Sequence, residues 1–192
     1  MRSQVILDIG CGNKKVPNSI GIDKFRLSSV DLIHDLENFP YPLKDNYADL
    51  IYARHFLEHT NNPIKILNEL WRIGKPNGKI IITVPHYSGV SAWIDITHKR
   101  CFSYNTFDNL LHKREYYLGK AKFKILRKKL KWSYLISNPI EPFEKSKTNF
   151  LVKAIPALIQ LLINIAPSFC ERFWCYWVGG LREVYVELEV VK

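Results

Sequence analysis

The feature that most constrains the fold is a series of short apolar runs joined by connections that are too short for helices. The runs span residues 4–9, 19–23, 30–35, 48–53 and 79–84. Apolar runs of this kind are typical of buried strands in a mostly parallel sheet of an α/β fold. Only residues 10 to 18 separate the first two runs, and residues 24 to 30 connect the second to the third. Because a helical crossover needs about 10–12 residues or more, we expect at least one helix to be missing and one face of the sheet to be poorly covered.

Later elements are predicted from periodicity and capping residues. Asn62 and Pro63 are predicted as the N-cap and first helical position of an amphipathic helix that should end at Gly74, followed by a turn over residues 76–78. Residues 104–118 have the pattern of a helix that follows the fifth strand.

The C-terminal part predicts an antiparallel strand pair. Residues 181–191 alternate between valine or leucine and glutamate or tyrosine, which is typical of a half-solvated strand. We expect it to pair antiparallel with a strand inside residues 121–135, with its glutamates opposite the lysines. The apolar segment 149–178 lies between them and predicts two short helices broken near Pro167. We expect these helices to cover the bare sheet face, with a dimer contact or a membrane-surface contact as alternatives.

Charge is concentrated in one segment. The net charge is +10 over 192 residues, but residues 113–131 alone carry 9 basic and 1 acidic side chains. A uniformly basic chain would indicate a nucleic-acid binder, whereas one basic strip indicates an anionic surface or ligand at one place. The same lysines are also typical of a solvated edge strand.

The cysteines and the N-terminal residues indicate a reducing, cytoplasmic setting. The four cysteines form no C-x-x-C pair, so a zinc or redox motif is not predicted. The first apolar run is too short for a signal peptide.

Acidic and glycine residues gather where the first three predicted strands end. Residues 8–12 read D-I-G-C-G, and glycines at this position let a ligand approach the backbone. Asp23 ends the second strand, where it could accept hydrogen bonds from ribose hydroxyls, and Asp35 follows the third, where an adenine amino group could lie. A dinucleotide fingerprint would need glycine at position 15, which is Lys15. These residues therefore favour a nucleoside ligand other than NAD.

This pattern resembles the consecutive motifs of class I S-adenosylmethionine-dependent methyltransferases, and in particular a small bacterial type-11-like subgroup. The matching segments are residues 8–12, 21–23, 34–36, 47–59 and 74–84. The L-E-H at 57–59 before Asn-Pro is similar to many small-molecule members, and residues 84–100 resemble a bacterial subgroup. The shortened first crossovers depart from the family pattern.

The resemblance implies a Rossmann-like sheet that forms one domain, residues 1–192. Its parts would be a cofactor-binding core (1–86), a substrate-side loop and helix (87–118), and antiparallel strands with the apolar insertion (119–192). The resemblance also implies S-adenosylmethionine as the cofactor. The residues implied to bind it are Asp8, Gly10, Cys11, Gly12, Asp23, Lys24, Asp35, Leu36, Arg54 and His55.

Several side chains could act as the general base that removes a proton from the methyl acceptor. We single out His86, His98 and Asp95, because an imidazole near its usual pKa suits proton removal from a hydroxyl or amine. A mutual hydrogen bond between Asp95 and His98 is the alternative interpretation, and His59 is interpreted as a capping or packing residue. No further ligand motif supports a metal, so no metal site is predicted.

The leading hypothesis is methyl transfer to a small-molecule or saccharide-type acceptor. One alternative is an RNA methyltransferase that uses the strip 113–131. The other is a non-catalytic module that acts at a membrane surface or a partner through residues 149–178.

Overall fold

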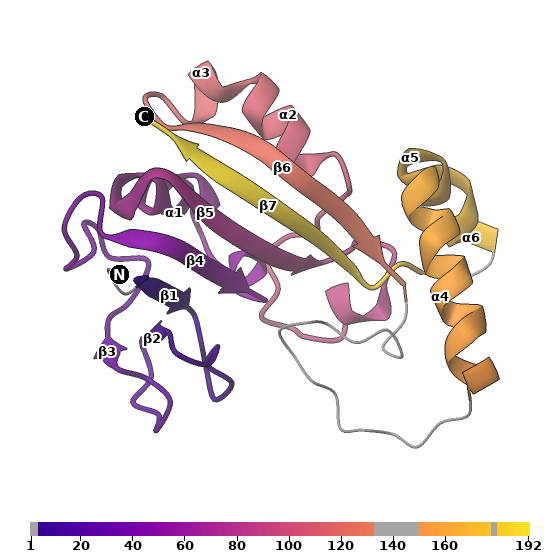
Figure 1. Ribbon diagram of the computed structural model, residues 1–192, viewed down its shortest axis with the longest axis horizontal. Helices are drawn as coiled ribbons and strands as arrows, with labels where there is room; N and C mark the ends of the chain where they lie inside the picture. The colour runs from indigo at the N-terminus through magenta and orange to yellow at the C-terminus, as the bar shows by residue number, and fades with distance from the viewer. Residues whose placement is uncertain (1–3, 133–149, 178–179) are drawn as a thin grey trace.

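The computed structural model describes residues 4–132, 150–177 and 180–192, and its centre is one mixed sheet (Figure 1). The seven strands are β1 (Ile6–Ile9), β2 (Ile20–Asp23), β3 (Leu32–Ile33), β4 (Ala48–Arg54), β5 (Gly74–Pro85), β6 (Lys122–Lys131) and β7 (Glu183–Val191). Their order across the sheet is β3-β2-β1-β4-β5-β7-β6. The first five strands run parallel, and β7 is antiparallel to both β5 and β6. The predicted Rossmann-like sheet with an antiparallel C-terminal pair is confirmed.

The helices follow the predicted order, but one predicted helix is split and one predicted turn lies within a strand. They are α1 (Pro63–Ile73), α2 (Thr106–His112), α3 (Arg114–Tyr117), α4 (Phe150–Ile165), α5 (Pro167–Phe169) and α6 (Cys175–Trp177). Single turns are present at η1 (Leu57–His59) and η2 (Val90–Ala92), and η3 (Cys170–Trp174) is π-helical. The helix predicted over 104–118 is two helices that break at Lys113. The turn predicted at 76–78 is part of an irregular stretch within β5, because Ala48 pairs with Gly74 but Leu50 pairs with Lys79.

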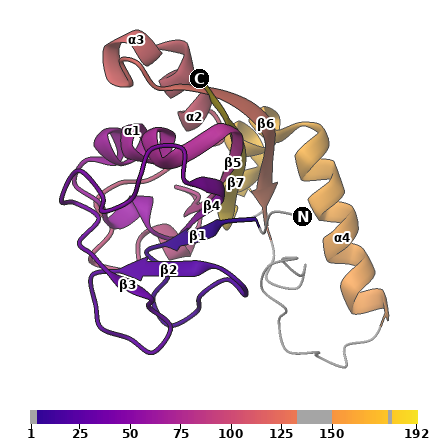
Figure 2. The same ribbon diagram turned by 60° about the vertical axis from the view of Figure 1, so that its left-hand side comes forward.

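One face of the sheet lacks helices over its first strands, as the short connections predict. No helix occurs between β1 and β2 or between β2 and β3. Right-handed crossovers toward β2 and β3 would lie on one face, and the crossover from β4 to β5, which contains α1, lies on the other (Figure 2). On the α1 face, Leu7, Ile51 and Ile80 align in register and are buried. On the opposite face, Tyr52 and Ile81 align and are half-buried.

Carboxylates fix the first two connections in place of helical packing. The backbone N–H of Val16 donates to Asp8 Oδ2 at 2.8 Å, which holds the first connection against β1. In the second connection, Asp31 accepts a hydrogen bond from the backbone N–H of Gly21 at 2.7 Å and pairs with Lys15 at 2.6 Å. The Lys15 hydrogen bond lowers the pKa of Asp31. Because these bonds satisfy buried backbone groups, loops can replace the missing helices.

The apolar insertion packs against the edge strand β6. Its break at Pro167 is as predicted. The Trp132 N–H donates to Gln160 Oε1 at 2.9 Å, and the Leu130 N–H donates to Asn164 Oδ1 at 3.0 Å. These two polar side chains, one helical turn apart on α4, therefore satisfy backbone groups of an otherwise unpaired sheet edge. In both views α4 lies beside β6 and away from β1–β3, so the insertion covers the sheet at this edge, whereas we expected it to cover the face left bare over the first strands (Figures 1 and 2). Within the described residues, no helix has the length and apolar character needed to cross a membrane.

Candidate functional site

The Gly10–Gly12 turn follows the carboxyl end of β1 and is hydrogen-bonded to the carboxyl end of β2. The Gly10 N–H donates to the Ile22 carbonyl at 2.8 Å, and the Gly12 N–H donates to Asp23 Oδ2 at 3.0 Å. These strands are parallel, so the turn and the carboxylate meet at one edge of the sheet. Ligand crevices of α/β sheets open at this edge. Gly10, Gly12 and Asp23 therefore lie close together, as we expected.

The two glycines of the turn are required for different reasons. Gly10 has φ +64°, and a Cβ there would lie 2.5 Å from Cδ2 of Phe56. Gly12 has φ +51°, but no atom lies within 4 Å of a Cβ built on it. Gly10 is thus fixed by packing, whereas the open side of Gly12 leaves the backbone accessible to a ligand.

Asp23 is held in a fixed orientation with acceptor capacity to spare. It is 9% exposed, and its Oδ1 accepts a second hydrogen bond, from the Phe25 N–H at 3.1 Å. Each oxygen of a carboxylate can accept two hydrogen bonds, so both retain one free lone pair. This geometry suits a ligand with two adjacent hydroxyl groups.

Asp8 and Arg54 form a buried ion pair beside the turn. Asp8 is 1% exposed, and its Oδ2 accepts from Arg54 Nη2 at 2.9 Å. Burial raises the pKa of Asp8, and the guanidinium of Arg54 acts in the opposite direction. The other oxygen, Oδ1, is buried without a hydrogen-bond partner among the described residues. A ligand ammonium group at this position would satisfy it.

The remaining predicted cofactor residues are more scattered. Cys11 is buried, and burial raises the pKa of its thiol to about 11, which leaves it unreactive at neutral pH. Lys24 and Asp35 are exposed, and Leu36 is buried. Because β3 has only two residues, Asp35 lies two positions beyond the strand rather than at its end.

His55 carries a positive charge at the end of β4. Its backbone has φ +49°, and its ring nitrogens lie 3.4 Å from Glu58 Oε1 and 3.4 Å from Glu183 Oε1. Burial lowers the pKa of His55, but the two carboxylates outweigh that effect and raise the pKa to about 9. At neutral pH the imidazole is therefore protonated and cannot accept a proton.

His86 is separated from the other base candidates. It is fully buried, and its Nε2 lies 3.1 Å from Glu171 Oε1, which also accepts from the Tyr104 N–H at 2.8 Å. Burial lowers the pKa of His86. This network ties the end of β5 to η3 and leaves the ring no exposed surface.

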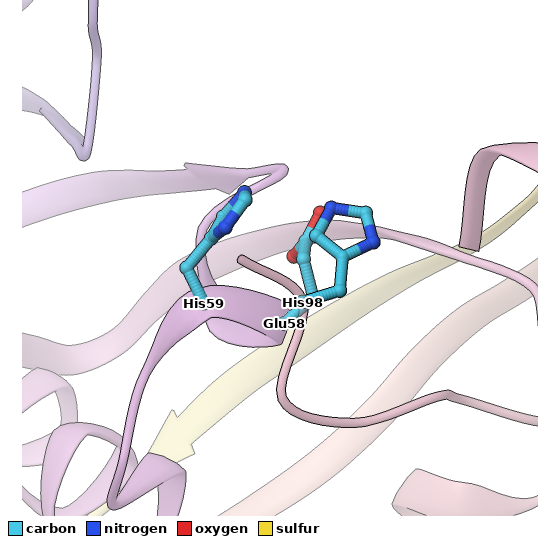
Figure 3. A group of neighbouring side chains, drawn as sticks. All are labelled: Glu58, His59 and His98. Atoms are coloured by element: carbon cyan, nitrogen blue, oxygen red, sulfur yellow. The ribbon is translucent and has the colours of Figure 1, made fainter. Parts of the chain in front are cut away.

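Asp95 and His98 lie together with two residues that the sequence did not assign to the site. Asp95 Oδ2 is 4.0 Å from His98 Nε2, which is ion-pair distance but too long for the hydrogen bond considered above. His98 lies beside Glu58 and His59 (Figure 3). The L-E-H motif at 57–59 contains Glu58 and His59, but its position in the sequence does not indicate a contact with His98.

A cavity of about 470 Å³ lies away from these residues. It is lined by Leu50, Lys79, Ile81 and Glu187, on the sheet face without helices, and by residues at the amino ends of β1, β4 and β5. Ligand crevices of parallel sheets open at the carboxyl ends, so this cavity is not the candidate site.

Comparison with known proteins places the chain among methyltransferase-like proteins. A family described as a methyltransferase domain matches residues 2–135. An uncharacterised protein of Methanocaldococcus jannaschii is 34% identical over 93 residues, which cover 42% of this chain and 40% of that protein. The match therefore spans less than half of that relative.

Solved structures share the fold at low sequence identity. A structure of a SAM-dependent methyltransferase from Archaeoglobus fulgidus is 20% identical, with a TM-score of 0.55 over 97% of this chain and 86% of that chain. A structure of a cyclase is 16% identical, with a TM-score of 0.55 over 100% of this chain and 76% of that chain. Likeness at this level of identity shows the fold alone.

Proposed function

The chain belongs to the methyltransferase-domain family, in the class I S-adenosylmethionine-dependent group, and we propose that it transfers a methyl group from S-adenosylmethionine to a small-molecule or saccharide-type acceptor. The observation that carries the proposal is the Gly12–Asp23 hydrogen bond, which holds a glycine turn and a carboxylate together at the carboxyl edge of the sheet. When bound, the cofactor supplies a methyl group already activated by its sulfonium charge. The protein then mainly has to position the reactants.

The residues around the turn fit this cofactor. We assign Asp23 to the ribose hydroxyls, because both its oxygens retain a lone pair. The partnerless Asp8 Oδ1 suits the ammonium group of the methionine moiety, beside the open side of Gly12. Asp35 and Leu36 are proposed at the adenine. Cys11, Lys24 and the pair of Arg54 and His55 would border the cofactor without being its main anchors.

The base candidates now differ in their suitability. His86 is buried in its network with Glu171, and His55, which is proposed to border the cofactor, is protonated at neutral pH and cannot accept a proton. His98 and Asp95 lie on a loop beyond the carboxyl end of β5, where a substrate can approach. We propose that any proton removal from the acceptor involves this loop rather than His86.

The test is calorimetric titration of the purified chain with S-adenosylmethionine and S-adenosylhomocysteine, beside an Asp23→Ala variant. We expect saturable micromolar binding that Asp23→Ala weakens at least tenfold, because one carboxylate holds both hydroxyls and the turn. Asp45→Ala is the matched control, since Asp45 is an exposed carboxylate paired with Arg72. An absence of binding in a folded, monodisperse sample would contradict the proposal.

An RNA acceptor is less well supported by the contacts of the basic strip. Three cations of β6 lie directly opposite glutamates of β7: Lys124 and Glu189, Arg127 and Glu187, Lys131 and Glu183. Cross-strand pairing offsets much of their charge, which leaves less of it available for phosphates. RNA binding that falls steeply with salt would instead favour this alternative.

The insertion provides a surface for a partner, whether the chain is an active methyltransferase or a non-catalytic module. Large apolar side chains on it are exposed: Leu158, Leu161, Leu162, Ile165, Phe169, Phe173, Tyr176 and Trp177. Such a patch supports the proposal of a homodimer contact or a peripheral membrane contact. The four free cysteines support a cytoplasmic setting as part of the same proposal.

A further inference from the structure

A second cluster of titratable side chains lies where η1 meets the loop that follows β5. Glu58 and His59 belong to η1, directly after β4, and His98 belongs to the loop between η2 and α2. One possible ligand atom from each of the three residues lies within 4.8 Å of the other two. In Figure 3 the carboxyl group of Glu58 lies between the two imidazole rings.

Glu58 is the unusual member of this cluster. It is 0% exposed, and neither of its carboxylate oxygens has a hydrogen-bond partner among the described residues. Its Oε1 has an ion-pair contact with His55 Nδ1 at 3.4 Å. Buried carboxylates are normally hydrogen-bonded, paired or bound to a metal, because an unsatisfied one is costly. Glu58 therefore offers a free oxygen toward the imidazoles.

The hydrogen bonds of the two histidines determine which ring nitrogens are free. His98 Nδ1 lies 3.1 Å from the Ala92 carbonyl, which can only accept, so Nδ1 carries the proton. The Thr97 hydroxyl donates to Asp95 Oδ1 at 2.7 Å, so its oxygen accepts from His59 Nδ1 at 2.8 Å. In both rings Nε2 is then the nitrogen with a free lone pair. Metal-binding histidines are typically oriented in this way, by a carbonyl or carboxylate behind the ring.

Backbone and side-chain contacts hold the two segments together. The Lys99 N–H donates to the Glu58 carbonyl at 2.8 Å. The Lys99 Nζ donates to Asn61 Oδ1 at 2.7 Å, and Arg100 Nη2 donates to the Asn61 carbonyl at 3.2 Å. The relative position of the three side chains is therefore fixed by contacts outside the cluster itself.

We propose that Glu58, His59 and His98 bind one divalent transition-metal ion of the zinc type. Two imidazole nitrogens and one carboxylate oxygen form a ligand set that suits such ions, and three protein ligands leave a coordination position open. Binding requires the ligand atoms to contract from within 4.8 Å to the roughly 3–4 Å spacing set by metal–ligand bonds of about 2.0–2.2 Å. Asp95, hydrogen-bonded to Thr97, acts as a positioning residue for His59. The site does not depend on the proposed methyl transfer, and when the ion is bound His98 has no lone pair left to act as the base considered above.

In the sequence, His98 follows Asp95 by three residues and no further ligand motif is near, so no metal site is predicted. The structure instead brings His98 to an element 40 residues earlier, as the hydrogen bond from Arg100 to Thr60 also shows. His86 lies in a different network, with Glu171.

The test uses the untagged chain of residues 1–192, stripped of metal by a chelator and titrated with ZnCl2 in a calorimeter. We expect one Zn²⁺ per chain, and with Co²⁺ as the probe a visible absorption spectrum of a low-coordinate site. His98→Asn and His59→Asn should each weaken binding about 100-fold or more, and Asp95→Asn about 10–100-fold through His59. His112→Asn is the matched control, because this exposed histidine lies on α2, outside the cluster.

Two measurements keep loss of binding distinct from loss of fold. Circular dichroism and thermal unfolding in excess chelator should be the same for wild type, His98→Asn and His112→Asn. Titration with S-adenosylhomocysteine in the chelator tests the cofactor site separately. The proposal is overturned if folded wild-type protein takes up no stoichiometric Zn²⁺, or if His98→Asn binds it as tightly as His112→Asn does.

Discussion

The backbone N–H of Gly12 donates to Oδ2 of Asp23 at 3.0 Å and so couples the first turn of the chain to the end of the second strand. In a longer α/β crossover, the N-terminus of a helix would follow this turn and supply free N–H groups to a ligand. Here the connection has no helix, and the carboxylates of Asp8 and Asp23 fix its backbone. The candidate site is thus built from loop backbone and acidic side chains.

The open side of Gly12 gives a prediction about cofactor affinity. Gly12 and Gly119 both have positive φ, and a Cβ meets no atom within 4 Å at either position. Changing either residue to alanine should destabilise the chain by about 1–2 kcal/mol, through backbone strain alone. Only Gly12→Ala should weaken binding of S-adenosylhomocysteine, by about tenfold or more. Urea unfolding and calorimetry on both variants check this, and equal affinities would show that no ligand approaches Gly12.

Gly10 should tolerate alanine less well than Gly12. A Cβ on Gly10 would lie 2.5 Å from Cδ2 of Phe56, in addition to the strain of a positive φ. We expect Gly10→Ala to cost about 1–3 kcal/mol more than Gly119→Ala in the free energy of unfolding, as overpacking does elsewhere. In a Phe56→Ala background the additional cost should largely disappear. A cost that persists without the ring would mean that strain, not the contact, fixes this glycine.

Much of the fold follows from local patterns in the sequence. The apolar runs predict the parallel strands, and the short connections predict the absence of helices between β1, β2 and β3. The alternation over residues 181–191 predicts β7 and its pairing with β6. Patterns of this kind could not predict the irregular pairing between Ala48 and Leu50, nor the break at Lys113, because neither depends on hydrophobic period.

The candidate site was predictable only where strand geometry determines it. Gly12 and Asp23 meet because parallel strands end at one edge. The contacts of Glu171 with His86 and of Glu58 with His98 join loops and helices far apart in the chain, and periodicity carries no information on such contacts. The position of the apolar insertion is likewise set by long-range contacts, because Gln160 and Asn164 accept hydrogen bonds from the edge of β6.

The buried pair of Asp8 and Arg54 predicts a large stability effect. Asp8 holds both the first connection, through Val16, and the guanidinium of Arg54, whose side chain is 10% exposed. Asp8→Ala should lower the free energy of unfolding by about 3–5 kcal/mol, because it removes a buried carboxylate that accepts from both the Val16 N–H and the Arg54 guanidinium. Asp45→Ala removes a carboxylate that is 70% exposed from Arg72 and should cost no more than about 1 kcal/mol. Equal costs in urea unfolding would show that Asp8 is dispensable for the loop.

The ion pairs of Glu183 predict how stability depends on pH. Glu183 is 2% exposed, and it pairs with Lys131 at 3.1 Å and with Arg182 at 2.9 Å. Burial raises the pKa of Glu183, but the ion-pair contact with His55 and the charges of Lys131 and Arg182 outweigh it and lower the pKa to about 2, from an ordinary value of 4.5. Since the folded pKa lies below the unfolded one, the ionised carboxylate stabilises the fold above about pH 4.5. This contribution is lost as the pH falls toward 2.

Glu183→Gln should therefore have a pH-dependent cost. At pH 7 we expect it to lower the free energy of unfolding by about 3 kcal/mol, the value of a shift of this size. The difference from wild type should shrink as the pH falls from 5 to 3, because wild type then binds a proton on unfolding that it excludes when folded. Glu189→Gln is the control on the same strand, half-buried opposite Lys124, and should differ from wild type by about 1 kcal/mol or less across this range. Urea unfolding of the three proteins at several pH values measures the effect, and a Glu183→Gln cost that is constant with pH would contradict it.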